Sequence, residues 1–290
     1  MSQPDAARDT GARTAHARSF GAVAAAYDRA RPSYPPDALA WLIGSGPLSV
    51  IELGAGTGKL TRMLVDAGHD VLAVDPSVEM LAHLHRNVPG ARTAVAAAES
   101  IPAPSRSADV VVCAQSFHWF DHDAALPEMA RVLRPGGRAA LVWNHRDESI
   151  PWVRRLGRII GSETDLADEV RPLQETPHFG WVEEARFRHW SDHTRESLLD
   201  LVRSRSAIAL LDEEERTTVL EQVRTLYDDY GRGPDGMRLP YLTECYRAVV
   251  RHRDAAPEAA ADQEPADPQA GTGSPEAPPE EPGTTLIDFR

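Results

Sequence analysis

The chain has 290 residues, of which 42% are hydrophobic and 26% charged, and its formal net charge is −13 at pH 7. This length suffices for one large core, or for one core with an insertion. The chain lacks the basic field of nucleic-acid-binding proteins and any apolar run of transmembrane length, and its two cysteines are too few for a disulfide framework or a zinc cluster. We therefore expect no nucleic-acid or membrane partner, and a cytoplasmic location because the first residues lack an apolar signal core.

Both ends of the chain are predicted to be disordered. Residues 1–18 are rich in Ala, Arg, Asp and Thr without hydrophobic periodicity, and residues 254–290 are rich in Ala, Pro, Glu and Gly. The C-terminal segment has nine acidic residues and one arginine, so it carries about −8 of the net charge. Residues 19–253 are expected to form one mildly acidic folded domain.

Hydrophobic patterning in the first half of this domain predicts alternating helices and strands. The predicted elements are a helix over 36–43, a strand over 49–53, a helix over 58–67, a strand over 71–75, a helix from Ser77 to the Pro89-Gly90 turn, strands over 91–96 and 109–114, a helix over 123–133 and a strand over 138–143. The strand over 109–114 is a continuous apolar run, as a buried parallel strand should be. This alternation predicts a parallel, doubly wound α/β sheet.

The alternation stops after residue 143. A helix is predicted over 152–160, a strand over 181–189, helices over 197–211 and 212–230, and over 239–250 a last strand, for which a helix remains possible. We infer a helical insertion at about 194–235, before the last strand and over the carboxyl edge of the sheet.

The most informative motif is a glycine-rich segment over residues 50–61. An apolar strand leads into Gly54, Gly56 and Gly58 and then into an amphipathic helix, whose free N–H groups can receive an anionic group. Asp75 ends the next strand about twenty residues after the first glycine, the spacing at which nucleotide-binding folds hold a ribose. The nicotinamide fingerprint requires glycine where Lys59 stands, whereas the upstream Glu52 suits a ligand with an ammonium group.

The pattern Glu-x-Gly-x-Gly-x-Gly with Asp75 resembles motif I and the ribose acid of class I S-adenosylmethionine (SAM) methyltransferases. Residues 98–102 resemble the adenine segment of that family, and residues 107–120 resemble its strand 4 motif. Residues 131–137 resemble a turn of ubiquinone/menaquinone-biosynthesis-like members, and residues 27–32, 118–120 and the helical insertion resemble trans-aconitate-methyltransferase-like members. The resemblance implies a Rossmann-like sheet of about seven strands, mostly parallel, with the last strand antiparallel.

The resemblance also implies a set of cofactor contacts. Glu52 would face the ammonium of SAM, the glycine-loop backbone its methionine and sugar, and Asp75 its ribose hydroxyls. Gln115 and Ser116 would lie under the sulfonium and methyl. The full candidate set is Glu52, Gly54, Ala55, Gly56, Gly58, Asp75, Pro76, Met80, Ala98, Glu99, Gln115, Ser116 and Tyr27, with Pro76, Met80, Ala98 and Glu99 around the adenine; core packing remains an alternative for Met80. Tyr27, Arg31 and Tyr34 are candidates to close over the cofactor, or only to anchor the N-terminal helix.

For catalysis, His118 is the candidate general base, with loop orientation or substrate binding as alternatives. Trp119 and Phe120 are candidates for an apolar acceptor wall, or for burial under a loop. Arg146, after the strand over 138–143, would suit a carboxylate acceptor, or would form a surface ion pair with a neighbouring acid. His118 and His122, like His83 and His85, lack the further ligands that zinc requires, so no metal is expected.

These observations favour a SAM-dependent methyltransferase that acts on a small molecule at oxygen, on a carboxylate or hydroxyl. A methyltransferase-like module that binds SAM or its product S-adenosylhomocysteine without catalysis, as a regulatory or partner-binding protein, is the alternative. A nicotinamide oxidoreductase is a third hypothesis, against which the glycine spacing and Glu52 argue. The sequence leaves the acceptor and the oligomeric state open.

Overall fold

The computed structural model describes residues 32–162, 166–231 and 236–252. The predictions for residues 1–18 and 254–290, and the candidates Tyr27 and Arg31, lie outside these ranges. Between Pro32 and His252 the described residues belong to one structural unit.

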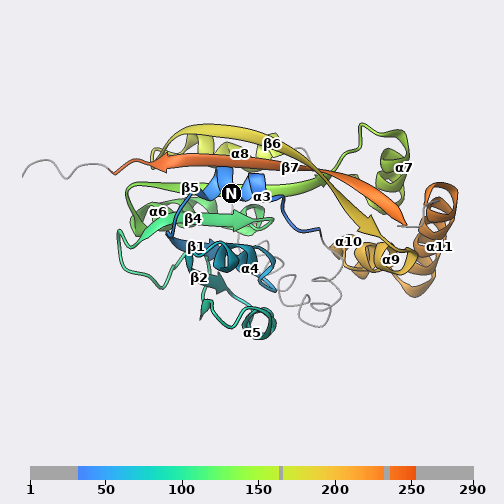
Figure 1. Cartoon of the computed structure of the whole chain (residues 1–290), viewed down its shortest axis with the longest axis horizontal. Helices are drawn as coiled ribbons and strands as arrows, with labels where there is room; N and C mark the ends of the chain where they lie inside the picture. Colours follow the sequence, from blue (N-terminus) through green and yellow to red (C-terminus); the bar gives the residue numbers. More distant parts are fainter. Residues whose placement is uncertain (1–31, 163–165, 232–235, 253–290) are drawn as a thin grey trace, which may run out of the picture. The chain divides into compact units, whose positions relative to one another are not determined.

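Seven strands form one sheet in the order β3-β2-β1-β4-β5-β7-β6 (Figure 1). Strand β7 is antiparallel to both β5 and β6, and every other neighbouring pair is parallel, which confirms the expected topology. The strands are β1 (Ser49–Leu53), β2 (Asp70–Asp75), β3 (Arg92–Val95), β4 (Ala108–Ala114), β5 (Leu133–Arg146), β6 (Phe179–His193) and β7 (Met237–Val250).

The helices agree with the predicted ones within a few residues, with two exceptions. The predicted helix over 197–211 is two shorter helices, α9 and α10, and the helix α8 was not predicted. The described helices are α3 (Pro36–Ile43), α4 (Lys59–Asp66), α5 (Val78–Asn87), the 3-10 turn η2 (Phe117–Trp119), α6 (His122–Val132), α7 (Pro151–Ile160), α8 (Leu166–Glu175), α9 (Arg195–Arg203), α10 (Ser206–Ala209) and α11 (Glu213–Tyr230). No helix in these ranges is long and apolar enough to cross a bilayer.

Both faces of the sheet are covered, because alternate side chains of each central strand enter different cores. Along β4, Val111 and Cys113 pack with α6 and α8, whereas Val110 and Val112 pack with α3 and α4. Every one of these four side chains is fully buried. Strand β4 is therefore apolar on both faces over residues 110–114, as the sequence indicated.

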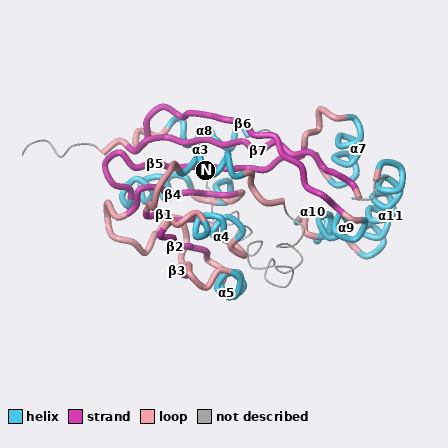
Figure 2. Tube along the Cα trace, in the orientation of Figure 1, coloured by secondary structure: helices cyan, strands magenta, loops and turns pink. Residues whose placement is uncertain are grey.

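The helical insertion has a core of its own. Apolar residues of α9, α10 and α11 pack with one side of α7 and with the first residues of β7. Figure 2 shows these helices grouped beyond one end of the strand layer. Because β5 and β6 run toward α7 and α9, the insertion follows the carboxyl ends of these strands.

Strands β5 and β6 are longer than predicted, and this corrects the position of one site candidate. Strand β7 is 14 residues long, and its antiparallel ladder with β5 extends to the pair Arg146–Tyr241. Asn144, His145 and Arg146 thus lie within β5 rather than in a loop after it. The predicted turn at 134–137 lies within the bounds of β5, at a register shift against β4.

Candidate functional site

The glycine loop between β1 and α4 is closely packed at two of its three glycines. Gly54 and Gly58 have φ angles of 70° and 87°, which L side chains rarely adopt. A Cβ at Gly54 would lie 2.5 Å from the Cβ of Ser116, and a Cβ at Gly58 would lie 2.6 Å from the Cγ of Leu84. Only glycine therefore fits at these two positions.

Gly56 differs from its neighbours because it is open. Its φ is 56°, and a Cβ at this position would meet no atom within 4 Å. Its backbone N–H donates to Oδ2 of Asp75 at 2.9 Å. The loop thus exposes bare backbone at Gly56, directly beside the carboxylate that ends β2.

Asp75 joins the glycine loop to the start of α5. Its Oδ2 accepts from Gly56 N, and its Oδ1 accepts from Ser77 N at 2.9 Å. The side chain is 8% exposed; burial raises the pKa of Asp75, and the two backbone hydrogen bonds oppose this rise. Each carboxylate oxygen has lone pairs for a further donor, so Asp75 retains the capacity to accept two hydroxyls.

Glu52 lies beneath the glycine loop rather than on an open surface. It is 1% exposed, and the Thr61 hydroxyl on α4 donates to its Oε2 at 2.6 Å. Burial, with a smaller contribution from the Asp75 charge, raises the pKa of Glu52 to about 8, and the Thr61 hydrogen bond opposes the rise. Thr61 was missed by the sequence analysis; its signal is a polar residue on the apolar stripe of a helix.

The candidate adenine residues lie on two segments, the start of α5 and the loop after β3. Pro76 is exposed, whereas Met80 and Ala98 are buried. Glu99 is half-buried, and its Oε1 accepts from the backbone N–H of Asp121 at 2.8 Å. Glu99 thus already holds the N-cap region of α6.

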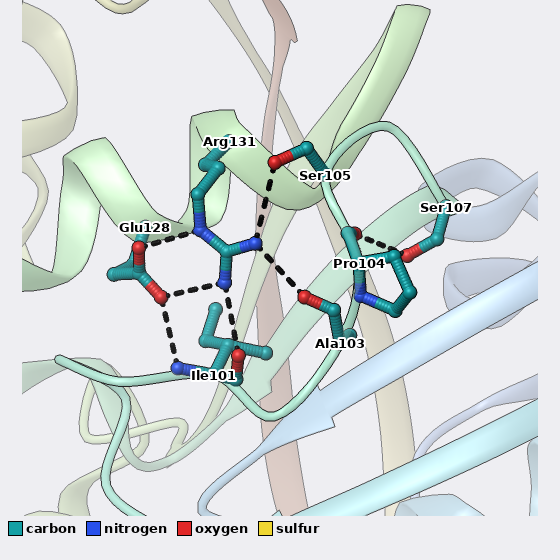
Figure 3. Close-up of polar contacts among 7 residues, drawn as sticks. All are labelled: Ile101, Ala103, Pro104, Ser105, Ser107, Glu128 and Arg131. Atoms are coloured by element: carbon teal, nitrogen blue, oxygen red, sulfur yellow. Dashed lines mark hydrogen bonds and ion pairs between the residues drawn. The ribbon is translucent and has the colours of Figure 1, made fainter.

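The loop after Glu99 is fixed by an ion pair that the sequence analysis did not single out (Figure 3). Arg131 on α6 contacts the Glu128 carboxylate through Nε and Nη2, at 2.7 and 2.8 Å. The same guanidinium donates to the carbonyls of Ile101 and Ala103, and Glu128 accepts from Ile101 N at 3.0 Å. This Glu128–Arg131 clamp attaches the candidate adenine segment to α6.

The segment after β4 turns sharply toward the glycine loop. Gln115 is a non-glycine residue with a φ of 57°, and its Nε2 donates to the Asn144 carbonyl at 3.1 Å. The Ser116 hydroxyl donates to the carbonyl of Leu53 at 2.7 Å. Gln115 and Ser116 therefore lie between β1 and β5, at the carboxyl ends of the central strands.

The 3-10 turn η2 places two aromatic candidates differently. Trp119 is 44% exposed, and His118 lies beside it with ring centroids 4.7 Å apart. Phe120 is half-buried and packs edge-on against Phe117. His122 stacks on Phe117 and contacts its carbonyl through Nε2. In the described part of the chain no group of three metal-ligating side chains converges.

Arg146 does not lie where the sequence suggested. It is 3% exposed, and its Nη2 contacts Glu148 Oε1 at 3.1 Å and the Gly161 carbonyl at 2.8 Å. The expected ion pair with a neighbouring acid exists, but it is buried against the end of α7. The reason is the ladder with β7, which extends β5 and takes Arg146 into the junction with the insertion.

The N-terminal end of the described chain is also tied to β5. Asn144 donates through Nδ2 to the carbonyl of Ser33 at 3.1 Å, and its Oδ1 accepts from the Thr243 hydroxyl at 2.6 Å. Tyr34 belongs to the core that α3 and α4 form on the sheet. Tyr34 thus anchors this N-terminal segment to the core.

Comparison with known proteins agrees with this geometry. A family model described as a methyltransferase domain matches residues 51–141, from β1 into β5. An uncharacterized methyltransferase of Mycobacterium tuberculosis (strain ATCC 25618 / H37Rv) is 45% identical over 235 residues, which cover 80% of this chain and 96% of that protein.

Two further comparisons are more distant. A malonyl-[acyl-carrier protein] O-methyltransferase of Methylococcus capsulatus is 37% identical over 133 residues, 42% of this chain and 48% of that protein. The solved structure of a putative type II methyltransferase from Anaeromyxobacter dehalogenans has a TM-score of 0.56 and 24% identity, and the match covers 76% of this chain and 97% of that one. This last likeness shows the shared fold.

Proposed function

We propose, from the premise that this chain belongs to the class I SAM-dependent methyltransferases, that it methylates an oxygen atom of a small carboxylic acid. The cofactor is SAM, which supplies a methyl group already activated by its sulfonium. The work left to the chain is to bind and align the two substrates and to exclude water.

The proposed cofactor contacts rest on the open backbone at Gly56 beside Asp75. A Cβ at Gly56 would meet no atom within 4 Å, so a ligand can approach the loop backbone closely there, and the Asp75 oxygens each have capacity for a ribose hydroxyl. Glu52 is proposed to act from beneath the loop, as a buried carboxyl that a neighbouring ligand cation would ionise. Pro76, Met80 and Ala98 are proposed to flank the adenine.

The observation that carries the acceptor class is the chemistry of residues 115–120. This segment follows β4 and contains an amide, a hydroxyl, an imidazole and three aromatic rings, but no carboxylate. Such a segment neither repels an anion nor supplies a counter-charge for an ammonium. A carboxylate acceptor needs no proton removed, so it requires only alignment.

The similarity to a malonyl-[acyl-carrier protein] O-methyltransferase supports the same class, and it covers less than half of each chain. The helical insertion at about 194–235 is proposed to cover the acceptor, because it follows the carboxyl ends of β5 and β6.

The first test is titration calorimetry with SAM, S-adenosylhomocysteine and NAD in parallel. Micromolar binding of the two sulfur compounds without NAD is expected. A panel of malonate, citrate, a malonyl thioester and simple phenols, incubated with deuterated SAM and followed by mass spectrometry, then tests the acceptor. Transfer to phenols or amines alone would contradict the carboxylate proposal, and binding without any transfer would favour the non-catalytic alternative.

A further inference from the structure

A buried indole contacts the candidate catalytic histidine. Trp143 on β5 is 2% exposed, and its Nε1 donates to Nδ1 of His118 on η2 at 3.5 Å. This bond joins the carboxyl ends of β4 and β5, the edge at which ligands of open α/β sheets bind. It is also adjacent to the proposed cofactor site, because Ser116, two residues before His118, packs against Gly54.

The direction of this hydrogen bond is unambiguous. An indole N–H is a donor only, so Nδ1 of His118 must offer its lone pair. In a neutral imidazole one nitrogen carries the proton and the other accepts, so a His118 that accepts this bond at Nδ1 carries its proton on Nε2. An imidazolium does not fit the same contact, because both of its nitrogens are donors.

Trp143 is held in place by the sheet and by the core around its ring. Its backbone pairs with Glu244 in the β5–β7 ladder, and its ring meets Tyr246 edge-on, with the centroids 6.1 Å apart. The indole is part of the core formed with α6 and α8. Losing the His118 contact would leave a buried N–H without this acceptor, which is unfavourable.

We propose that Trp143 is a positioning residue that holds His118 in the neutral form protonated at Nε2, so that His118 donates a hydrogen bond to the acceptor instead of removing a proton from it. This inference rests on the proposed methyl transfer and deepens it. The acceptor must then arrive already ionised. Its carboxylate oxygen attacks the methyl carbon, the carbon–sulfur bond breaks, and its electron pair goes to sulfur. The products are a neutral ester and S-adenosylhomocysteine, and no proton is transferred.

The tautomer can be measured without turnover. Long-range 1H–15N correlation spectra of the full chain, with S-adenosylhomocysteine present and at neutral pH, distinguish the two neutral tautomers and the imidazolium. The His118 signals are assigned by their loss in His118→Gln. We expect the Nε2-protonated form in the natural chain and a mixture in Trp143→Phe, which keeps a smaller aromatic ring and removes the N–H. A proton on Nδ1, or an imidazolium, would overturn the inference.

The role is tested by a matched pair of amides. The Gln side chain can place an N–H near Nε2 of histidine, whereas the shorter Asn places its polar group near Nδ1. With the carboxylic acid that gives the highest rate in the panel, His118→Gln is expected to stay within about tenfold of the natural kcat/KM, and His118→Asn and His118→Ala to fall by about ten- to a hundredfold further. Loss in His118→Gln as complete as in His118→Ala, about 10² to 10⁴, would identify a general base instead.

Two controls separate this inference from failures of other kinds. SAM affinity and melting temperature of each variant show whether folding or cofactor binding has changed. Trp143→Phe in the His118→Ala background should lower kcat no further if Trp143 acts only through His118. If the natural chain methylates no carboxylic acid, the proposed function fails, yet the spectra still decide whether Trp143 sets the tautomer.

Discussion

The backbone N–H of Gly56 donates to Oδ2 of Asp75 at 2.9 Å, and this bond joins the end of β2 to the loop after β1. The two residues are not neighbours in the sequence. The parallel pairing of β1 with β2, from Ser49–Asp70 to Leu53–Val74, brings them together. The cofactor contacts proposed for Gly56 and Asp75 depend on this hydrogen bond.

Replacing Asp75 by Ala should weaken SAM binding by about tenfold or more, because the two charge-assisted hydrogen bonds proposed to the ribose hydroxyls would be lost. Titration calorimetry measures the change. The matched control is Asp70→Ala, in the same strand but at its other end, where Asp70 forms an exposed ion pair with Arg92. SAM affinity should be unchanged in that control. Equal affinity in the Asp75 variant and the natural chain would remove Asp75 from the site.

Replacing Gly56 by Ala should weaken SAM binding but lower the free energy of unfolding only slightly. The added methyl group meets no protein atom, but it occupies the space in which SAM is proposed to contact the backbone of the glycine loop. The positive φ still costs about 1 kcal/mol. Gly136→Ala is the control, because Gly136 has a φ of 80° and equally open surroundings. The two variants should melt at similar temperatures, and only Gly56→Ala should bind SAM more weakly.

Replacing Glu52 by Gln should change how stability depends on pH. The pKa of Glu52 is about 8 in the folded chain and near 4.5 when unfolded, so between these values the folded state binds the extra proton. The contribution of Glu52 to the free energy of unfolding is therefore fully present below about pH 4.5. It is lost as the pH rises toward 8, by at most about 1.4 kcal/mol per pH unit.

Urea unfolding at pH 5, 6, 7 and 8 measures this effect as the difference between the natural chain and Glu52→Gln. The difference should grow in favour of the variant as pH rises. A difference that is constant across the four pH values would show that Glu52 titrates alike in both states.

Replacing Arg131 by Ala should loosen the loop after Glu99. The change removes the Glu128 ion pair and two hydrogen bonds to the carbonyls of Ile101 and Ala103, for a loss of about 1–3 kcal/mol of stability. Arg92→Ala removes an exposed pair instead and should cost less than about 1 kcal/mol. Because the clamp supports the candidate adenine segment, adenosine binding should weaken in Arg131→Ala, whereas Arg92→Ala should bind adenosine normally.

The features that could be predicted from the sequence are those that local patterns encode. The glycine spacing, Asp75 and the apolar run of β4 each depend on a few neighbouring residues. The parallel part of the sheet follows from the alternation of strands and helices, whereas the antiparallel last strand was implied only by the family resemblance. The helix α8 was missed because Pro172 lies inside it, although Leu166, Val170 and Leu173 are buried at helical spacing. Proline disfavours a helix in isolation, and here packing against the sheet outweighs that preference.

The remaining features depend on contacts between distant parts of the chain. The burial of Arg146 and the place of Trp143 follow from pairing with β7, about a hundred residues later. The Glu128–Arg131 clamp is visible in sequence only as a common helical i, i+3 pair, and its carbonyl partners are 28 and 30 residues away from Arg131. Side-chain partners of this kind are determined by the fold, so no local sequence pattern predicts them.

Because the helical insertion has a core of its own, we expect that the insertion can be exchanged between related chains. Its apolar contacts are made among α7, α9, α10, α11 and the start of β7, whereas the glycine loop, Asp75 and the clamp are held by β1 to β5 and their helices. A substitution inside the core of the insertion should therefore leave the packing around the glycine loop unchanged. Grafting the insertion between related chains, with α7 included, would test whether it sets the acceptor preference, as proposed, while the cofactor site stays unchanged.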